Sequence, residues 1–201
     1  MIITLKDGST KEYSEPKSII EIAADISEGL ARAACAGEVN GKVVDLRTVI
    51  DSDCELNILT AKDEKGLAVL RHTASHVLAQ AVQTLFPDAK VAIGPSIDTG
   101  FYYDFECQSF SRDDLDAIEK EMKKIIKKGA KIERFTKSRE DAIAFFKEKN
   151  EPYKVELIED LPEDAEISFY QQGEFVDLCA GPHLMTTLSL IHISEPTRHL
   201  R

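Results

Sequence analysis

The first part of the chain alternates between hydrophobic and polar positions over short stretches, as half-buried strands do. Residues 2–5 alternate, Asp7-Gly8 is a turn signal, and residues 11–13 return as a second strand. Ser18 and Glu21 then have the spacing of a capping box, and the hydrophobic positions that follow keep the period of a helix. The pattern predicts a β-hairpin followed by a helix over residues 19–34.

Three further strands are indicated before residue 61. Asn40-Gly41 separates residues 38–39 from 42–44, which is a hairpin signal, and residues 55–60 form a last hydrophobic run. A hairpin, a helix and more strands within about sixty residues are typical of a β-grasp, ubiquitin-like module. We therefore assign residues 1–61 to such a module and take the short polar stretch 61–66 as its boundary.

A long amphipathic helix is predicted over residues 67–86, where Pro87 ends it. His72 and His76 lie roughly opposite its hydrophobic stripe, beside small side chains. A histidine in a core is usually a satisfied core residue, and this alternative stays open for the pair. The stripe consists of Leu70, Ala74, Val77, Ala81 and Leu85, and the small neighbours are Ala68, Ser75 and Ala79.

The remaining pattern predicts a second, α+β domain. A helix capped by Ser111 has acidic residues in its first turn and lysines in its last, and it ends at Gly129. A further helix is expected over residues 138–149. Strands are expected at 90–93, 101–105, 131–135, 153–158 and 174–178, the first two joined by turns at 94–95 and 98–100. The predicted fold class is α+β, with a β-grasp domain followed by this domain.

The charge balance excludes some functions. The 201 residues have a formal net charge of −11, which argues against a chain that wraps nucleic acid over its whole surface. One stretch differs, since eight basic residues lie between Lys120 and Lys137 against two acidic ones, Glu121 and Glu133. We favour a solvated helix face for this stretch, and a nucleic-acid patch is the alternative.

No feature of the sequence indicates secretion or a membrane. The first residues lack a basic segment followed by a hydrophobic run, and no hydrophobic stretch approaches spanning length. The cysteines do not show the spacing of a disulfide framework. They are Cys35, Cys54, Cys107 and Cys179. We expect a cytoplasmic protein with reduced thiols and no membrane partner.

Two residue pairs carry the candidate chemistry. His72 and His76 are four positions apart in the predicted long helix, and Cys179 and His183 have the same spacing in a Gly-Pro turn. Neither pair is specific alone. Together they supply three imidazoles and a thiol, which can form either a zinc site or a metal-free hydrolytic pocket.

Three segments closely resemble the amino-terminal half of the threonyl-tRNA synthetase family. They are Arg71-His-Thr-Ala-Ser-His76, Ala92-Ile-Gly-Pro-Ser-Ile-Asp-Thr-Gly-Phe-Tyr-Tyr-Asp104 and Asp177-Leu-Cys-Ala-Gly-Pro-His183. The resemblance implies a TGS domain over 1–61 and a tRNA editing domain over 62–187. Residues 188–201 match nothing in the family, so we expect an incomplete editing domain with a foreign or frameshifted tail, and His192 and His199 receive no role.

The editing domain of that family hydrolyses serine wrongly attached to threonine tRNA, and the resemblance implies which residues do so here. The implied catalytic residues are His72, His76, Lys154, Asp177, Cys179 and His183, with Lys154 on a strand. The implied substrate-binding residues are Gly94, Pro95, Tyr102 and Tyr103.

We expect the two helical histidines to hold the water and the substrate, while His183 shares the proton work. Asp177 would orient either the serine ammonium or a histidine tautomer. Lys154 would neutralise developing charge or contact the terminal ribose and phosphate. Cys179 would be a thiol donor or a pocket wall rather than a covalent nucleophile.

The metal question stays open at this point. A metal ion would bind His72, His76, Cys179 and His183, and the related alanine-type editing domains bind zinc with this pattern. The threonine-type domain resembled here is expected to work without zinc, and four filled positions leave no site for an activated water. We favour a site with no cofactor. The family's ATP site and its zinc belong to a catalytic core that this chain lacks, so we expect no tRNA charging.

The expected partner is the acceptor end of threonine tRNA mischarged with serine, and the expected activity is aminoacyl-tRNA deacylation. The synthetase family dimerises mainly through the absent core, so we expect a monomer. Two other interpretations stay open: a non-catalytic module that binds tRNA or a protein, and an inert fragment.

Overall fold

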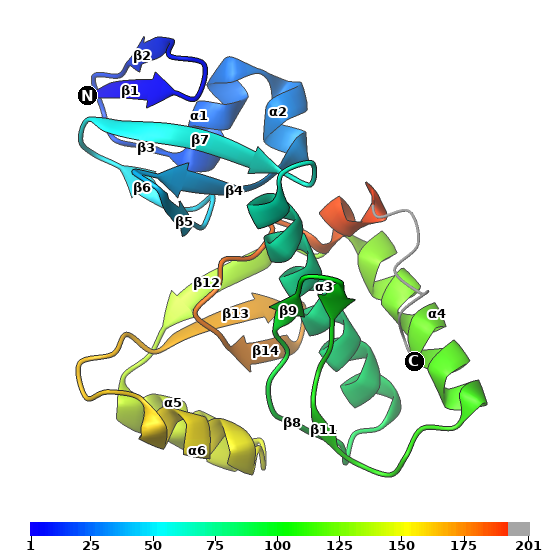
Figure 1. Cartoon of the computed structure of the whole chain (residues 1–201). Coiled ribbons are helices and arrows are strands. Elements are labelled where there is room, and N and C mark those ends of the chain that lie inside the picture. Colours follow the sequence, from blue (N-terminus) through cyan, green and yellow to red (C-terminus); the bar gives the residue numbers. More distant parts are fainter. Residues whose placement is uncertain (193–201) are drawn as a thin grey trace. The chain divides into compact units, whose positions relative to one another are not determined.

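The computed structural model describes residues 1–192, in two units (Figure 1). One unit consists of residues 1–70 with 181–185, and the other of residues 71–180 with those from 186 onward. The division falls inside the long helix α3 (Glu64–Leu85), whereas the sequence predicts a boundary at residue 61. His199 and the rest of the predicted tail beyond 192 lie outside the described residues.

The first unit is built on a five-stranded sheet of order β2-β1-β7-β4-β5. Strands β1 and β7 are parallel, and the other pairs are antiparallel. Both predicted hairpins are confirmed, and Asn40 and Gly41 adopt the positive φ angles, 48° and 85°, that their two-residue turn requires. The strands are β1 (Ile2–Leu5), β2 (Thr10–Glu12), β4 (Ala34–Val39), β5 (Lys42–Val44) and β7 (Cys54–Thr60).

The predicted continuous helix over residues 19–34 is wrong, because Ser27 interrupts it. Helix α1 (Ile19–Ile26) ends there, and α2 (Glu28–Ala33) begins with the Ser27 side chain accepting a hydrogen bond from the Leu30 N–H. Serine competes for backbone groups in this way and therefore favours caps over helix interiors. The short pair β3 (Lys17–Ser18) and β6 (Val49–Ile50) was not predicted. The unit's core consists of Ile3, Ile19, Ile22, Ala34, Leu46, Ile50 and Leu56.

In the second unit, α3 is followed by two small antiparallel pairs. Strands β8 (Lys90–Val91) and β11 (Phe105–Glu106) pair with each other, and β9 (Ser96–Ile97) pairs with β10 (Gly100–Phe101). The predicted strand over 101–105 is therefore broken in its middle. Helix α4 (Arg112–Lys128) has the predicted Ser111 cap and ends at Gly129, whose φ is 62°.

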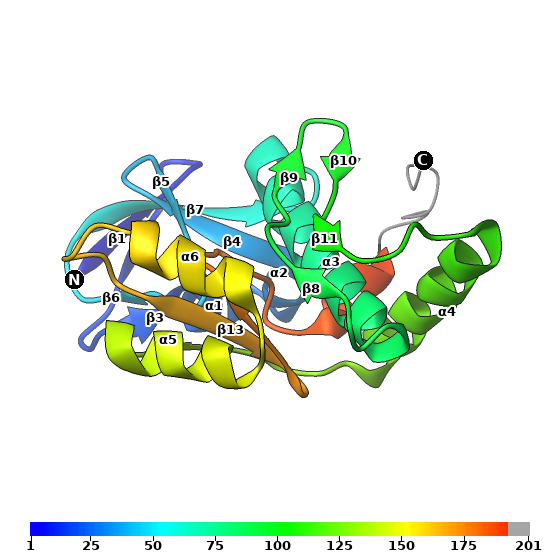
Figure 2. The same ribbon diagram turned by 90° about the horizontal axis from the view of Figure 1, so that it is seen from below.

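A three-stranded antiparallel sheet, with β13 in the middle, forms the rest of the unit. Helices α5 (Arg139–Glu148) and α6 (Pro152–Asp160) pack beside it (Figure 2). The predicted strand at 153–158 is wrong, since these residues belong to α6. Pro152 starts that helix with a preset φ, and a short hydrophobic run does not distinguish strand from helix. The strands are β12 (Ile132–Thr136), β13 (Ser168–Gln172) and β14 (Phe175–Leu178).

The two faces of this sheet differ in chemistry. Val176 and Leu178 pack with the hydrophobic cluster of α5, α6 and β13, which contains Phe146 and Phe169. Asp177, between them in sequence, points to the other face and lies near α3. The two-residue period of a strand thus places a carboxylate toward the helix that carries the histidines.

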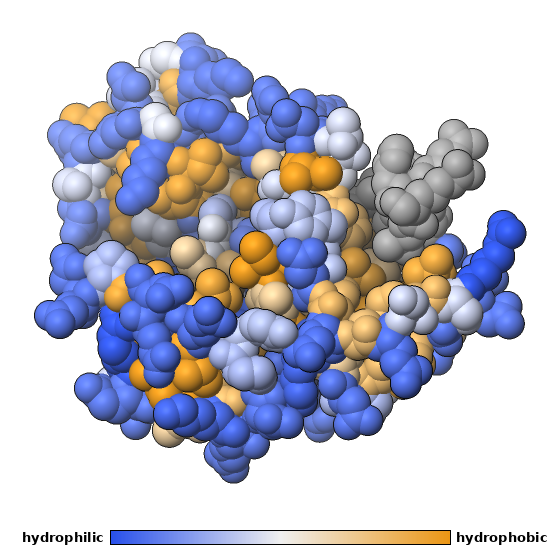
Figure 3. Space-filling model, turned by 60° about the horizontal axis from the view of Figure 1, so that its bottom comes forward, coloured by the Kyte–Doolittle hydropathy of each residue, from blue (hydrophilic) through white to orange (hydrophobic). Residues whose placement is uncertain are grey.

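The 3₁₀ helix η1 (Thr187–His192) packs against α4. The Thr187 N–H donates to the carbonyl of Ala130, its hydroxyl donates to the carbonyl of Ile125, and Leu190 is buried. None of the described helices has the length and hydrophobicity needed to cross a membrane. Hydrophilic side chains cover most of the face drawn in Figure 3.

Candidate functional site

Helix α3 places His72 and His76 one turn apart, with ring centroids 5.2 Å apart in an edge-on arrangement. The predicted hydrophobic stripe is buried as far as Ala81, but Leu85 is 38% exposed, contrary to its assignment to the core. The opposite side of the helix is also buried, since His76 is only 3% exposed. The histidine pair therefore lies in the interior of the unit, with His72 at its less buried end.

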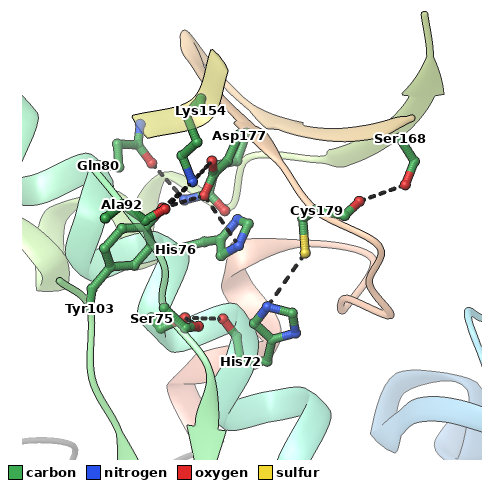
Figure 4. A network of polar contacts seen from close by, with 12 residues as sticks. His72, Ser75, His76, Gln80, Ala92, Tyr103, Lys154, Ser168, Asp177 and Cys179 are labelled. Carbon is green, nitrogen blue, oxygen red and sulfur yellow. Dashed lines mark hydrogen bonds and ion pairs between the residues drawn. The ribbon is translucent and has the colours of Figure 1, made fainter. Parts of the chain in front are cut away.

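Cys179 lies beside His72. Its Sγ atom is 3.5 Å from Nε2 of His72, and both residues are half-buried (Figure 4). The backbone of Cys179 is fixed to β13, because the Ser168 hydroxyl donates to its carbonyl at 2.6 Å and its N–H donates to the Ser168 carbonyl at 3.0 Å. A thiol and an imidazole thus meet at the more open end of the site.

Asp177 is the centre of a buried polar cluster (Figure 4). Its Oδ1 atom lies 2.6 Å from Nζ of Lys154, and its Oδ2 accepts a hydrogen bond of 2.6 Å from the Tyr103 hydroxyl. Nε2 of His76 is 3.5 Å from the same Oδ2. Lys154 comes from α6 and not from a strand, so the prediction of its element is wrong.

The Lys154 ammonium has three oxygen neighbours. Besides Asp177, it donates to the carbonyl of Ala92 at 2.6 Å and to the hydroxyl of Tyr103 at 2.9 Å. An ammonium has three N–H donors, so these three oxygens match its full capacity. Since Lys154 is 2% exposed, its charge acts inside the unit and away from solvent.

Burial and charge set the protonation states of the cluster. Burial alone would raise the pKa of Asp177, but the Lys154 ammonium and His76 bring its pKa below the usual value. Burial lowers the pKa of His76 to about 3, and burial also lowers the pKa of His72. Both imidazoles are therefore neutral near pH 7, and each has a ring nitrogen that can accept a proton.

The predicted substrate-binding residues divide between different environments. Tyr103 is buried in the Asp177 cluster, whereas Tyr102 is 41% exposed. The Ser75 hydroxyl donates to the carbonyl of Gly94 at 2.6 Å, which ties this loop to α3. A Cβ atom at Gly94 would lie 2.1 Å from the Tyr103 ring, so only glycine fits here. Pro95 accepts a long hydrogen bond, 3.5 Å, from the Tyr102 N–H.

His183 belongs to the segment Gly181–Met185, which groups with the first unit. Its N–H donates to the Asp45 carboxylate at 3.3 Å, and the Arg47 guanidinium donates to its carbonyl at 3.4 Å. Arg47 also donates to the carbonyl of Leu184 at 3.1 Å. Sequence reasoning did not predict this support by Asp45 and Arg47, because no local motif links them to a segment more than a hundred residues away.

The ligand atoms of His72, His76 and Cys179 lie within 4.8 Å of one another, so the site contains a His/Cys cluster that could hold a metal ion. Two imidazoles and a thiolate are ligands that zinc prefers. Nε2 of His76 faces Asp177, as carboxylates often do with metal-binding histidines. The chemistry of these side chains is therefore compatible with zinc.

The basic stretch between Lys120 and Lys137 is largely paired with neighbouring groups. Lys123 and Lys124 on α4 form ion pairs with Glu119 and Glu121 one turn away. Lys131 pairs with Glu133, Arg134 pairs with Glu166, and Lys137 lies over the rings of Phe135 and Phe145. These contacts favour the solvated helix face over a dedicated nucleic-acid patch.

Comparison with known proteins shows what this chain is similar to. The model of the TGS domain matches residues 1–60. The chain is 63% identical over 186 residues to a threonine–tRNA ligase of Acetivibrio thermocellus, which is 92% of this chain and 29% of the relative. The chain corresponds to the N-terminal region of threonine–tRNA ligases.

Two other threonine–tRNA ligases show similar identity and coverage. Threonine–tRNA ligases of Caldanaerobacter subterraneus and Clostridium novyi are 59% and 57% identical over 188 and 186 residues. The match covers 93% and 92% of this chain and 29% of each relative. The chain thus spans less than a third of the length of the curated threonine–tRNA ligases it matches.

Proposed function

We propose that the second unit hydrolyses the ester bond of a mischarged aminoacyl-tRNA. Its substrate would be threonine tRNA that carries serine. The observation that carries this proposal is the arrangement around Asp177: a half-buried imidazole–thiol pair adjoins a buried cluster of carboxylate, ammonium and neutral imidazole. The similarity to threonine–tRNA ligases supplies the substrate class, since their name states that they join threonine to tRNA.

A threonine–tRNA ligase has a chemical reason to need such a site. Serine lacks one methyl group of threonine, and a pocket that accepts threonine cannot exclude a smaller side chain. A methyl group is worth about 1–3 kcal/mol in a hydrophobic pocket, a discrimination of roughly 10–200-fold. A second, hydrolytic site that accepts serine esters and excludes the threonine methyl would remove the remaining errors.

His72 is the general base in this proposal. Its ring is neutral near pH 7 and lies at the less buried end of the site, where a water molecule and an ester can approach. It takes a proton from water, the water oxygen bonds to the ester carbonyl carbon, and the bond to the ribose oxygen breaks. That oxygen takes up the proton, which leaves free serine and uncharged tRNA. The neighbouring Cys179 thiol orients the ring.

Asp177 and Lys154 act from inside the unit. Because Asp177 already has the Lys154 ammonium, the Tyr103 hydroxyl and His76 as neighbours, we assign it to orienting His76 and not to binding the serine ammonium. The three oxygens around Nζ make Lys154 a fixed positive charge, which stabilises negative charge that develops on the ester carbonyl. His183 would share the proton work, as the family resemblance implies.

The loop that contains Gly94, Pro95 and Tyr102 is the proposed contact for the acceptor end of the tRNA. Ile93, Ile97 and Tyr102 are all more than 40% exposed in this loop and its hairpin, so three large hydrophobic side chains close in sequence are accessible to a ligand. An exposed aromatic ring can stack on a terminal base, and such stacking contributes about 1–3 kcal/mol per base.

We propose that the site works without a metal ion, although its ligands suit zinc. Four filled ligand positions, with His183 as the fourth, would leave no open position for the attacking water.

The deciding experiment measures the hydrolysis of seryl-tRNA and threonyl-tRNA by the purified chain. We expect faster hydrolysis of the seryl ester, and a loss of about 10²–10⁴-fold in His72→Ala, the usual contribution of a general base. Thr84→Ala, an exposed change on the same helix, is the matched control and should hydrolyse normally. Chelator treatment should leave the rate unchanged, and one tightly bound zinc per chain would overturn the metal-free assignment.

Hydrolysis of neither ester would refute the proposal. If the chain also retained tRNA in a salt-dependent gel-shift assay, the non-catalytic binding module would be the better interpretation. Equal hydrolysis of both esters would support the proposed deacylase activity and refute its selectivity for serine.

A further inference from the structure

Glu151 is a buried acidic residue that the mechanism above does not use. It is 6% exposed, although glutamate is almost never buried without a partner. It occupies the N-cap position of α6, yet its side chain makes no capping hydrogen bond there. Burial raises the pKa of its carboxyl group, which indicates that holding a charge at this position is unfavourable.

The carboxylate instead connects α6 to two other elements. Oε1 of Glu151 accepts a hydrogen bond of 2.5 Å from the Gln83 side chain on α3, and Oε2 accepts one of 3.1 Å from the backbone N–H of Val91 on β8. Gln83 lies two turns after His76 on the same helix. The contacts of Glu151 therefore join the helix that carries the histidines to the helix that carries the lysine.

Glu151 and Lys154 form hydrogen bonds with the backbone of two consecutive residues, Val91 and Ala92. Glu151 accepts from the N–H of Val91, and Lys154 donates to the carbonyl of Ala92. The two residues lie three positions apart, Glu151 at the N-cap of α6 and Lys154 in its first turn. The carboxylate that accepts from one backbone N–H and the ammonium that donates to the next carbonyl fix the position of α6 along this segment, and this position places Nζ of Lys154 near Tyr103 and Asp177.

We propose that Glu151 is a positioning residue for the deacylation, which acts by holding the Lys154 ammonium against Asp177 and Tyr103. This inference rests on the proposed function for its effect on rate, but its effect on Lys154 can be measured without any activity. Glu151 touches no reacting atom. Its removal would free the start of α6 and let the ammonium move away from the carboxylate.

The test compares Glu151→Ala with Glu151→Gln. The glutamine keeps an oxygen for the Val91 N–H, and Gln83 can rotate its amide to restore the second hydrogen bond, whereas alanine removes both. We expect Glu151→Ala to lower kcat for seryl-tRNA hydrolysis at least tenfold with KM nearly unchanged, and Glu151→Gln to stay within about threefold of wild type. Glu159→Ala, an exposed position on the same helix, is the matched control.

A second measurement reports on Lys154 itself. Its amine should be protected from acetylation by acetic anhydride in the wild type, because it is buried and surrounded by oxygens, and mass spectrometry should find it labelled at least fivefold more in Glu151→Ala. Inactive wild-type protein with this labelling difference would refute the proposed function and keep the positioning role of Glu151. Unchanged labelling in folded Glu151→Ala, or equal losses of kcat in the alanine and glutamine variants, would overturn the inference.

If Glu151→Ala fails to fold, Gln83→Ala provides the same test, because it removes only one of the two hydrogen bonds. We expect it to increase labelling of Lys154 and to lower kcat by a smaller factor. Wild-type labelling and wild-type kcat in Gln83→Ala would then refute the inference.

Discussion

The two units of the chain fill their interiors in different ways. The main core cluster of the first unit consists of hydrophobic side chains, with Ile3, Ile19 and Ile22 fully buried in it. The second unit buries a comparable aromatic cluster between α5, α6 and β13, and it also buries Asp177 and Lys154, which are 1% and 2% exposed. Hydrophobic burial stabilises both units, but the charged pair of the second unit is buried more deeply than the Asp45–Arg47 pair of the first, in which Asp45 is 8% exposed and Arg47 is only partly buried.

This difference distinguishes side chains that stabilise the fold from side chains that serve the chemistry of the site. Moving a charge out of water costs several kcal/mol even after the protein relaxes, and a partner charge compensates only when the geometry is good. A core that needed only to fold would fill the same volume with hydrophobic side chains. The cluster around Asp177 is therefore the part of the second unit that folding alone does not explain.

The largest effect should follow from breaking the buried ion pair. Lys154→Ala leaves the Asp177 carboxylate buried without its ammonium, which should lower the free energy of unfolding of the second unit by about 3–5 kcal/mol. Chemical denaturation measures this, with the exposed Lys147→Ala on α5 as the control. A loss below 1 kcal/mol would contradict the conclusion that the second unit depends on a buried ion pair. Replacing both charges, as in Lys154→Met with Asp177→Asn, should cost less than Lys154→Ala alone.

A second effect should appear on acidification, and above pH 4.5 it should be largest in the second unit. The pKa of His76 is about 3 in the folded protein and 6.5 without burial, so between these values the unfolded chain binds more protons. The free energy of unfolding should fall as the pH drops from 6.5 toward 3, by up to about 1.4 kcal/mol per pH unit. The lowered pKa of His72 acts in the same direction, and that of Asp177 adds a loss below 3.8.

Hydrogen exchange of backbone amides can separate the two units in this measurement. Amides of β14 should lose protection between pH 6.5 and 4.5, after correction for the intrinsic exchange rate, whereas amides of β7 should change little. In His76→Gln, the protection of the β14 amides should depend less on pH. Equal slopes in the two strands would show that the buried imidazole does not set the acid sensitivity.

The smallest effect concerns the hydrophobic core of the first unit. Ile22→Val removes one buried methylene and should lower the free energy of unfolding of this unit by about 0.5–1.5 kcal/mol. The same change at Ile2, which is 47% exposed, should fall within about 0.5 kcal/mol of zero. Thermal or chemical denaturation measures both changes. A larger loss for the change at Ile2 than for the change at Ile22 would contradict the assignment of Ile22 to the core.

The sequence predicts features that depend on near neighbours. The hairpin at Asn40-Gly41 and the Ser111 cap were predicted correctly, because each depends on residues within a few positions. The helix α6 was taken for a strand, since hydrophobic residues in a run this short fit both periods.

The candidate site was only partly predictable for the same reason. His72 and His76 could be found from their spacing. The Tyr103–Asp177 hydrogen bond joins residues 74 positions apart, and no local pattern indicates it. Glu151 resembles an ordinary acidic residue at a helix start, and only its contacts with Gln83 and Val91 distinguish it.

The alternation along β14 makes the chemistry sensitive to the length of one turn. Gly173, with a φ of 61°, lies in the two-residue connection between β13 and β14 that sets their pairing of Tyr170 with Asp177. One inserted residue there would exchange the strand's two faces and bring the carboxylate among the phenylalanines, while Val176 or Leu178 met the imidazoles. An insertion at Gly173 would therefore remove the acid from the site without changing any residue of it.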